Sequence, residues 1–213
     1  MNVRTFRPRY LWRRLAQRSF ERRHPTAPWL CQNAVYFLDA WLRPTDDGFE
    51  WGSGRSTVWF ARRCARVCSV EHNAKWHAVV AARLAAEGLS GKVVYRLVPC
   101  DHDEVDEPQD HAYAHVIEEY PENSFDWVLV DGNIRLTCLR AATKRVRPGG
   151  LLILDNANRY VPNFVDGDFA TVHEGRGEPR TPGWTQALRE LEQWRAVLTS
   201  DGIWDTRFWQ KPA

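Results

Sequence analysis

One segment decides the fold, because a predicted strand is followed there by a predicted helix: Phe49-Glu50-Trp51-Gly52-Ser53-Gly54-Arg55-Ser56-Thr57. Glycines at 52 and 54 allow a tight turn and leave room for a ligand against the backbone. The first N–H groups of the helix offer donors to an anion or a carboxylate. The segment has no GKS or GKT of a P-loop, and Thr57 stands where a dinucleotide fingerprint needs its third glycine. It indicates a nucleotide-type site of another kind, or else a purely structural turn.

From this segment onward, short apolar runs alternate with helical stretches, a pattern typical of a parallel sheet covered by helices on both faces. The predicted strands are residues 48–51, 67–71, 93–98, 125–130 and 151–154. The predicted helices between them are residues 57–64, 75–87, 113–119 and 137–146. Pro148-Gly149-Gly150 is expected to separate the last of these helices from the fifth strand.

The end of the chain follows another pattern. Residues 185–194 predict a helix, and residues 194–200 and 204–210 predict two strands on either side of Asp201-Gly202, whose turn preference favours a β-hairpin. Five βα units and this hairpin predict an α/β fold with a seven-strand, mostly parallel sheet, helices on both faces and an antiparallel C-terminal pair. We expect residues 1–47 to form a basic, helical N-terminal extension and residues 48–213 to form the main domain.

Composition places the chain among globular proteins. It has 213 residues, of which 44% are hydrophobic and 26% charged, so disorder throughout is excluded. No apolar run approaches the roughly 20 residues that span a bilayer. The N-terminus lacks the apolar core of a signal peptide, and the five cysteines have no CxxC spacing, which favours a reducing cytoplasm. Cys64 and Cys68 are expected to be buried, unpaired thiols.

Charge is distributed unevenly along the chain. Residues 1–23 contain eight arginines and one glutamate, a net charge of +7, which leaves −5 for the remainder. Such an arm could be drawn to phosphates or to an anionic membrane. The alternative is a terminal helix that packs on the domain and keeps its guanidinium groups in water. Its apolar side would then be Phe6, Tyr10, Leu11, Leu15 and Phe20.

Acidic residues end the second and third predicted strands. Glu71 lies 17 positions after Gly54 and could accept hydrogen bonds from both hydroxyls of a ribose at the switch point of the sheet. Asp101 could accept from an adenine amino group. The alternative for Glu71 is a solvated carboxylate at a strand end.

Five ordered segments resemble class I S-adenosylmethionine-dependent methyltransferases across roughly residues 48–211. They are EWGSGRST, SVEH, VPCD, FDWVLVDG and RPGGLLILDN. The resemblance implies a Rossmann-like fold in which the backbone from Gly52 to Gly54 holds the methionine moiety, Glu50 places its ammonium group, Glu71 binds ribose and His72 flanks adenine. The whole predicted cofactor set is Glu50, Gly52, Ser53, Gly54, Ser56, Thr57, Glu71, His72, Asp101 and Asp131. Arg55 departs from the family at a position that is small in many members.

Methyl transfer from a sulfonium requires donor and acceptor at near-attack distance without water. A hydroxyl acceptor must also lose its proton, to a general base or with the help of a divalent metal. Asp131, Asp155 and Asn156 end the fourth and fifth predicted strands, and their oxygens are ligands of the kind that Mg²⁺ prefers. Asp131 is also our predicted catalytic residue.

The Asp and Asp-Asn positions are similar to the metal site of catechol-type O-methyltransferases. That resemblance is incomplete, since Ile134 stands at the position of the family's catalytic lysine and the next residue is Arg135, which stays protonated and cannot act as an ordinary base. The alternative is that Asp131 only approaches the methionine amino group and that Asp155-Asn156 caps the fifth strand.

These observations favour a methyltransferase that acts on a small-molecule hydroxyl, with S-adenosylmethionine as cofactor and Mg²⁺ as an optional second one. The N-terminal helices and the aperiodic segment 157–183 are the predicted substrate elements. Two other hypotheses stay open: a nucleic-acid or protein methyltransferase guided by the Arg-rich arm, and a non-catalytic nucleotide-binding module. Neither the acceptor nor the oligomeric state can be read from the sequence.

Overall fold

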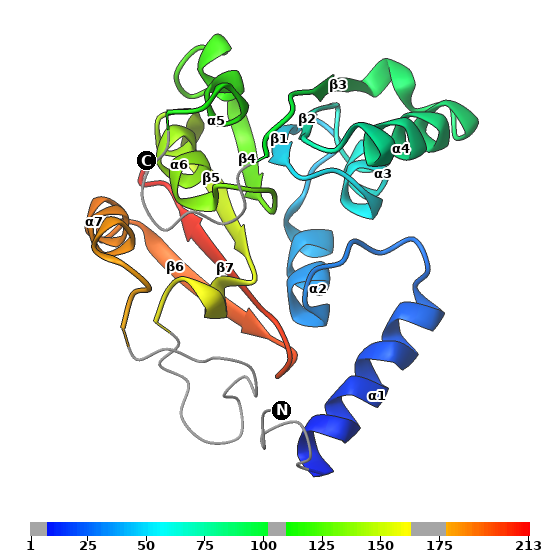
Figure 1. Ribbon diagram of the computed structural model, residues 1–213, viewed down its shortest axis with the longest axis horizontal. Helices are drawn as coiled ribbons and strands as arrows, with labels where there is room; N and C mark the ends of the chain where they lie inside the picture. The colour runs from blue at the N-terminus through cyan, green and yellow to red at the C-terminus, as the bar shows by residue number, and fades with distance from the viewer. Residues whose placement is uncertain (1–7, 102–109, 163–177) are drawn as a thin grey trace.

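The computed structural model describes residues 8–101, 110–162 and 178–213. Within these ranges a seven-stranded sheet has the order β3-β2-β1-β4-β5-β7-β6 (Figure 1). The strands are β1 (Asp47–Trp51), β2 (Arg66–Glu71), β3 (Val93–Leu97), β4 (Phe125–Val130), β5 (Val146–Asp155), β6 (Arg195–Ser200) and β7 (Asp205–Gln210). Strands β1 to β5 are parallel, whereas β7 is antiparallel to both β5 and β6. The predicted Rossmann-like sheet with a C-terminal hairpin is confirmed.

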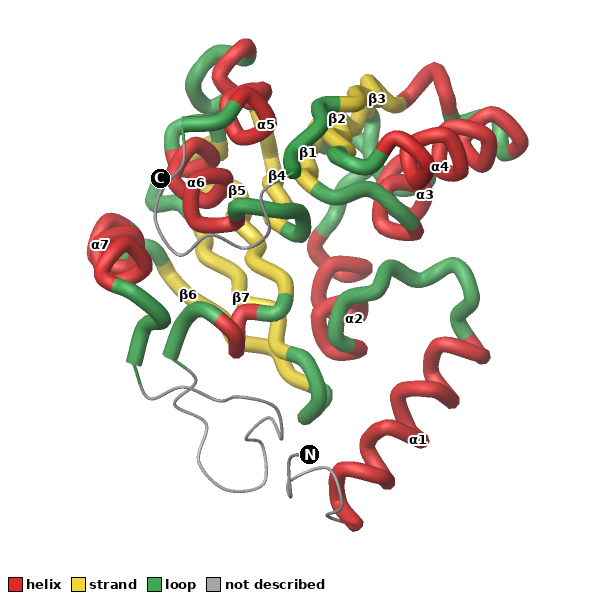
Figure 2. The backbone as a smooth tube through the Cα atoms, viewed as in Figure 1, coloured by secondary structure: helices red, strands yellow, loops and turns green. Residues whose placement is uncertain are grey.

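Helices connect the parallel strands and precede the first one (Figure 2). They are α1 (Pro8–Arg23), α2 (Gln32–Trp41), α3 (Arg55–Ala61), α4 (Ala74–Ala86), α5 (Ala112–His115), α6 (Arg135–Thr143) and α7 (Pro182–Glu190). Short 3₁₀ turns occupy Ser90–Lys92, Val116–Glu119 and Ala157–Arg159. None of the helices in the described ranges has the length and apolarity needed to cross a membrane.

Strict alternation along the central strands divides the core into two layers. Val128 and Val130 belong to the cluster that includes the buried side chains of α5, α6 and α7. Trp127 and Leu129 belong to the opposite cluster, which includes the buried apolar side chains of α2 and those of Trp59 and Phe60 on α3. Successive strand residues point to opposite faces, so a strand buried on both sides needs an uninterrupted apolar run, which the sequence 127–130 supplies. Cys64 and Cys68 are buried free thiols, as predicted.

The fifth strand differs from the prediction. It begins at Val146 and includes Pro148-Gly149-Gly150, which we expected to lie before it. Helix α6 ends earlier, at Thr143, and the pairing of β4 with β5 shifts register between Phe125 and Trp127. Pairing of β5 with β7 starts only at Leu151, so Pro148 interrupts no ladder on that side.

The predicted packing of the N-terminal helix is only partly correct. Phe20 is buried near the C-terminal end of α1 and meets the ring of Tyr36 on α2 edge to face, with 5.8 Å between centroids. Leu11 and Leu15 are more than half exposed instead of packed. Large apolar side chains lie on two sides of α1, and only one of these sides can face the domain. Phe6 lies outside the described residues.

Candidate functional site

A cavity opens where the strand order reverses. The chain leaves β1 through α3 toward β2, but leaves β4 through α6 toward β5, so the carboxyl ends of β1 and β4 border a crevice. We call it the switch-point cavity, and its volume is about 350 Å³. Its lining residues are Gly52, Ser53, Glu71, His72, Asn73, Trp76, Asp131, Gly132, Asn133 and Arg135.

The turn after β1 depends on Gly52. Its φ is +87°, in the region that favours glycine, and a Cβ there would lie 2.8 Å from the carbonyl carbon and oxygen of Asp131. Gly54 has an extended φ of 163°, and a Cβ would meet only the ring of Trp76, at 3.8 Å. The close approach of the β1 and β4 loops therefore requires the first glycine of the pair and not the second.

Glu71 is fixed at the floor of this cavity by hydrogen bonds to both oxygens. Its side chain is almost fully buried, and Oε2 accepts from the backbone N–H of Ser53 at 3.1 Å and from its hydroxyl at 2.6 Å. Oε1 accepts from the backbone N–H groups of His72 and Asn73 at 3.0 and 2.8 Å. Donors from two loops thus orient the carboxylate before any ligand arrives, as a preorganised acceptor requires.

Glu50 lies deeper, beneath the glycine turn, and is fully buried. Its Oε1 accepts from the hydroxyls of Thr57 and Ser69, the latter at 2.7 Å. Oε2 accepts no hydrogen bond among the described residues, although the Ser56 hydroxyl is near enough to lower the pKa of Glu50. Burial raises the pKa of Glu50 to about 7, because the charged form loses its water. An unsatisfied carboxylate oxygen at this depth is costly, which makes it an acceptor in need of a donor.

Five predicted cofactor residues do not line the switch-point cavity: Glu50, Gly54, Ser56, Thr57 and Asp101. Ser56 and Thr57 are buried in α3, where the Thr57 hydroxyl accepts from the N–H of Gly54 at 3.0 Å and supports Glu50. Asp101 is exposed after β3. The predicted residues that do line the cavity are Gly52, Ser53, Glu71, His72 and Asp131.

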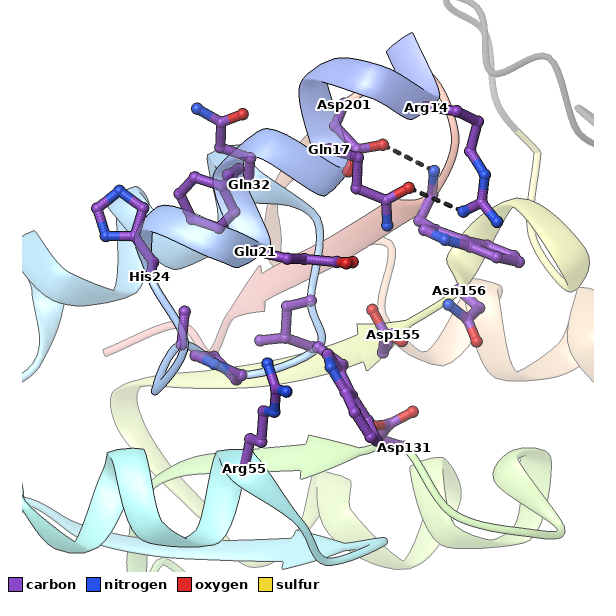
Figure 3. Close-up of a pocket in the computed structure, with 16 residues that line it drawn as sticks. Arg14, Gln17, Glu21, His24, Gln32, Arg55, Asp131, Asp155, Asn156 and Asp201 are labelled. Carbon is purple, nitrogen blue, oxygen red and sulfur yellow. Dashed lines mark hydrogen bonds between the residues drawn. The ribbon is translucent and has the colours of Figure 1, made fainter. Parts of the chain in front are cut away.

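A second cavity lies beside the first, between the carboxyl edge of the sheet and α1 (Figure 3). We call it the α1 cavity, and its volume is about 390 Å³. Its charged and aromatic lining residues are Arg14, Phe20, Glu21, His24, Trp29, Arg55, Asp131, Asp155, Asp201 and Trp204. Asp131 lines both cavities, so it stands at their junction.

Asp131, Asp155 and Asn156 converge on the α1 cavity, as the sequence predicted (Figure 3). Arg135 adds a cation to this group: it donates to Asp131 Oδ1 at 3.0 Å and to the Asp155 carbonyl at 2.5 Å. Asp155 also accepts from the Thr206 hydroxyl at 2.9 Å. A guanidinium bound to the carboxylate opposes a divalent cation by charge, and the described residues contain no group of three His, Cys, Asp or Glu that could hold a metal. The donor set does not fit the predicted Mg²⁺ site.

The two carboxyl groups of this cluster interact. Burial raises the pKa of Asp155 well above its ordinary value, and the nearby Asp131 raises it further. Burial also raises the pKa of Asp131, while the positive charge of Arg135 opposes that rise. Arg135 itself is buried at the start of α6, directly after Ile134, whose φ of 41° is left-handed and strained for a β-branched residue.

Sequence reasoning missed the aromatic wall that joins the two cavities. Trp76 donates its indole N–H to the Ser53 carbonyl at 2.8 Å and stacks on Trp29, with 6.3 Å between ring centroids. The guanidinium of Arg55 lies 4.9 Å from the Trp29 ring centroid. The side chain of Arg55, which stands where many family members have a small residue, points toward the α1 cavity (Figure 3). No local sequence signal places Trp29 opposite Trp76.

Residues 49–157, just over half of the chain, match a family described as a methyltransferase domain. The fold is similar to that of the O-methyltransferase TomG from Streptomyces achromogenes, solved with S-adenosylmethionine: TM-score 0.57, 20% identity, covering 85% of this chain and 80% of that one. The fold is also similar to that of a Klebsiella pneumoniae protein provisionally described as an O-methyltransferase, with TM-score 0.60 and 23% identity, covering 92% of this chain and 89% of that one. A possible exported protein from Bordetella parapertussis has TM-score 0.52 and 16% identity, covering 84% of this chain, which spans 65% of that one. No curated protein matches the sequence.

Proposed function

Because the chain belongs to the methyltransferase-domain family of S-adenosylmethionine-dependent enzymes, we propose that it transfers a methyl group to a hydroxyl of a small molecule bound in the α1 cavity. One observation carries this proposal: the switch-point cavity and the α1 cavity share Asp131. A donor held in one cavity then faces an acceptor held in the other, as in-line displacement requires.

The switch-point cavity is the proposed site of S-adenosylmethionine. Glu71 supports the ribose assignment because it lines this cavity, and because the Ser53 hydroxyl that now donates to Oε2 can donate to the Tyr95 hydroxyl instead and leave that acceptor site to a ribose hydroxyl. The unsatisfied Oε2 of Glu50 supports a role toward the methionine ammonium group. His72, at the cavity wall next to Glu71, is the proposed neighbour of adenine. When bound, the cofactor supplies the methyl group on a sulfonium.

The α1 cavity is the proposed acceptor site, and its size and charge favour a small molecule. About 390 Å³ is at the lower end of the range for ligand pockets. Four carboxylates line it, those of Glu21, Asp131, Asp155 and Asp201, against the two guanidinium groups of Arg14 and Arg55. This excess of negative charge disfavours the phosphates of a nucleic acid. Trp29 and Trp204 offer apolar surface to the body of an acceptor.

The Asp131 carboxylate is the proposed partner of the acceptor hydroxyl. It would orient the hydroxyl and take its proton at Oδ2, while Arg135 holds Oδ1 at 3.0 Å. No metal is part of this proposal, because the positive charge of Arg135 on Asp131 Oδ1 opposes a divalent cation at this carboxylate. The buried thiols Cys64 and Cys68 support the predicted reducing, cytoplasmic location.

A methyl-transfer assay with labelled S-adenosylmethionine tests the proposal on phenols, alcohols, amines and RNA. We expect turnover on a hydroxyl acceptor, and a loss of about 100-fold or more in kcat for Asp131→Asn. Asp39→Asn is a matched control, since Asp39 also pairs with an arginine, Arg63 at 2.8 Å, but on the surface. Methylation of RNA alone would support the nucleic-acid alternative. Cofactor binding without turnover on any acceptor would support the non-catalytic alternative.

A further inference from the structure

One side of α1 carries large apolar side chains that the domain does not cover. Leu11 is 53% exposed, Trp12 71% and Leu15 63%. Counted from Leu11, the positions of Trp12, Leu15, Arg18 and Arg22 follow after one, four, seven and eleven residues. This spacing places all five along a single side of a helix. We call this side the outer face of α1. Figure 1 shows α1 at the edge of the molecule.

The opposite side of the same helix is already occupied. Phe20 packs against Tyr36, and Arg14, Gln17 and Glu21 line the α1 cavity. The apolar residues of the outer face therefore have no role in the core or in the cavity. Three large apolar side chains grouped on one exposed helix face mark an interaction surface.

Charge identifies the kind of partner. Residues 8–23 contain six arginines and one glutamate, a net charge of +5, whereas residues 24–213 have a net charge of −5. An anionic surface complements the helix and is repelled by the rest of the protein, so contact would occur through α1 first. Two copies of α1 would repel each other.

The apolar residues distinguish a lipid surface from a nucleic acid. Contacts with the phosphates of a nucleic acid require only the arginines, and leucine side chains contribute nothing to binding a sugar-phosphate backbone. Tryptophan and leucine beside arginine suit the boundary between headgroups and acyl chains, where the apolar side chains enter the bilayer and the guanidinium groups meet lipid phosphates. We propose that the outer face of α1 binds the surface of an anionic lipid bilayer.

This docking would bring the α1 cavity close to the lipid, because the two sides of one helix face the bilayer and the cavity. The inference concerns binding alone and does not depend on the proposed methyl transfer. Failure of either leaves the other intact.

Co-sedimentation of the full chain with vesicles tests the inference. Vesicles of phosphatidylcholine with roughly 30% phosphatidylglycerol are compared with pure phosphatidylcholine, at low salt and at salt high enough to screen charges. We expect binding to the anionic vesicles only, decreasing with salt. The triple variant Leu11→Gln, Trp12→Gln, Leu15→Gln should partition onto the vesicles at least about tenfold more weakly. Arg18→Gln and Arg22→Gln should each weaken partitioning about fivefold.

Two matched variants control for general effects. Val79→Gln removes an apolar side chain that is 56% exposed on α4, and Arg189→Gln removes an exposed cation on α7. Both should bind vesicles as the wild type does, and circular dichroism should show equal helix content in all variants. Equal partitioning of the triple variant and the wild type, or no sedimentation with anionic vesicles, would overturn the inference. So would RNA binding or self-association that replaces vesicle binding.

Discussion

Replacing Glu50 by glutamine should change how the stability of the protein depends on pH. Glu50 is fully buried, and its pKa is raised from 4.5 to about 7 because the charged form is desolvated. Glutamine has nearly the same shape, and its amide oxygen can still accept from the hydroxyls of Thr57 and Ser69. The substitution therefore removes the titration and keeps the packing.

The sign and size of the effect follow from proton linkage. Below about pH 4.5 the carboxyl is protonated in both the folded and the unfolded chain, so it adds no pH dependence. Between that pH and about pH 7 the folded state binds more protons than the unfolded state, so the free energy of unfolding decreases as the pH rises. With about 1.4 kcal/mol for each pKa unit, the whole decrease is about 3 kcal/mol.

Urea unfolding of the wild type and Glu50→Gln at several pH values between about 5 and 8 measures this decrease. Other titrating groups are common to both proteins, so the difference between the two free energies isolates Glu50. We expect the wild type to lose about 2 to 3 kcal/mol relative to the variant over this range. Saturating S-adenosylmethionine should reduce the loss, because its ammonium group would stabilise the ionised carboxylate. A difference that stays constant with pH would refute the reasoning.

Three further predictions concern the cavities. Glu71→Ala should weaken S-adenosylmethionine binding in calorimetry by about 1.5 to 3 kcal/mol, the scale of hydrogen bonds to a charged group, and unchanged affinity would remove Glu71 from the site. Gly52→Ala should lower the melting temperature and abolish cofactor binding, because its Cβ would lie 2.8 Å from Asp131 backbone atoms. Gly54→Ala should change the melting temperature and cofactor affinity only slightly. A larger effect of Gly54→Ala than of Gly52→Ala would contradict the geometry of the turn. Dialysis against EDTA should leave turnover unchanged, since the positive charge of Arg135 on Asp131 Oδ1 opposes a divalent cation; activity lost with EDTA and restored by Mg²⁺ would restore the metal hypothesis.

The strand order and the edge that carries the site follow from features visible in the sequence. Apolar runs buried on both faces identify parallel strands, and the right-handed βα connection leaves few arrangements for them. Because the carboxyl ends of parallel strands share one edge, Glu71, Asp131 and Asp155 could be grouped before their positions were known. Local sequence patterns therefore predict most of the fold and the carboxylates of the site.

Features that depend on packing between distant segments could not be predicted. Trp29 and Trp76 stack across 47 residues of sequence, and neither has a local pattern that marks it. The orientation of Arg135 depends on the left-handed backbone of Ile134. A β-branched residue rarely adopts that conformation, so the sequence does not predict it. Periodicity identifies Leu11 and Leu15 as part of an apolar side of a helix, but it does not say whether the domain covers that side.

A crystal structure of the protein with S-adenosylhomocysteine tests the central claim most directly. The account predicts that the product cofactor occupies the switch-point cavity, with its ribose hydroxyls on Glu71 and its sulfur directed past Asp131 into the α1 cavity. The carboxylate of Asp131 should then lie beside the path from the sulfur to the space for the acceptor, within reach of the acceptor hydroxyl. A cofactor bound elsewhere, or one whose sulfur faces away from the α1 cavity, would contradict the account.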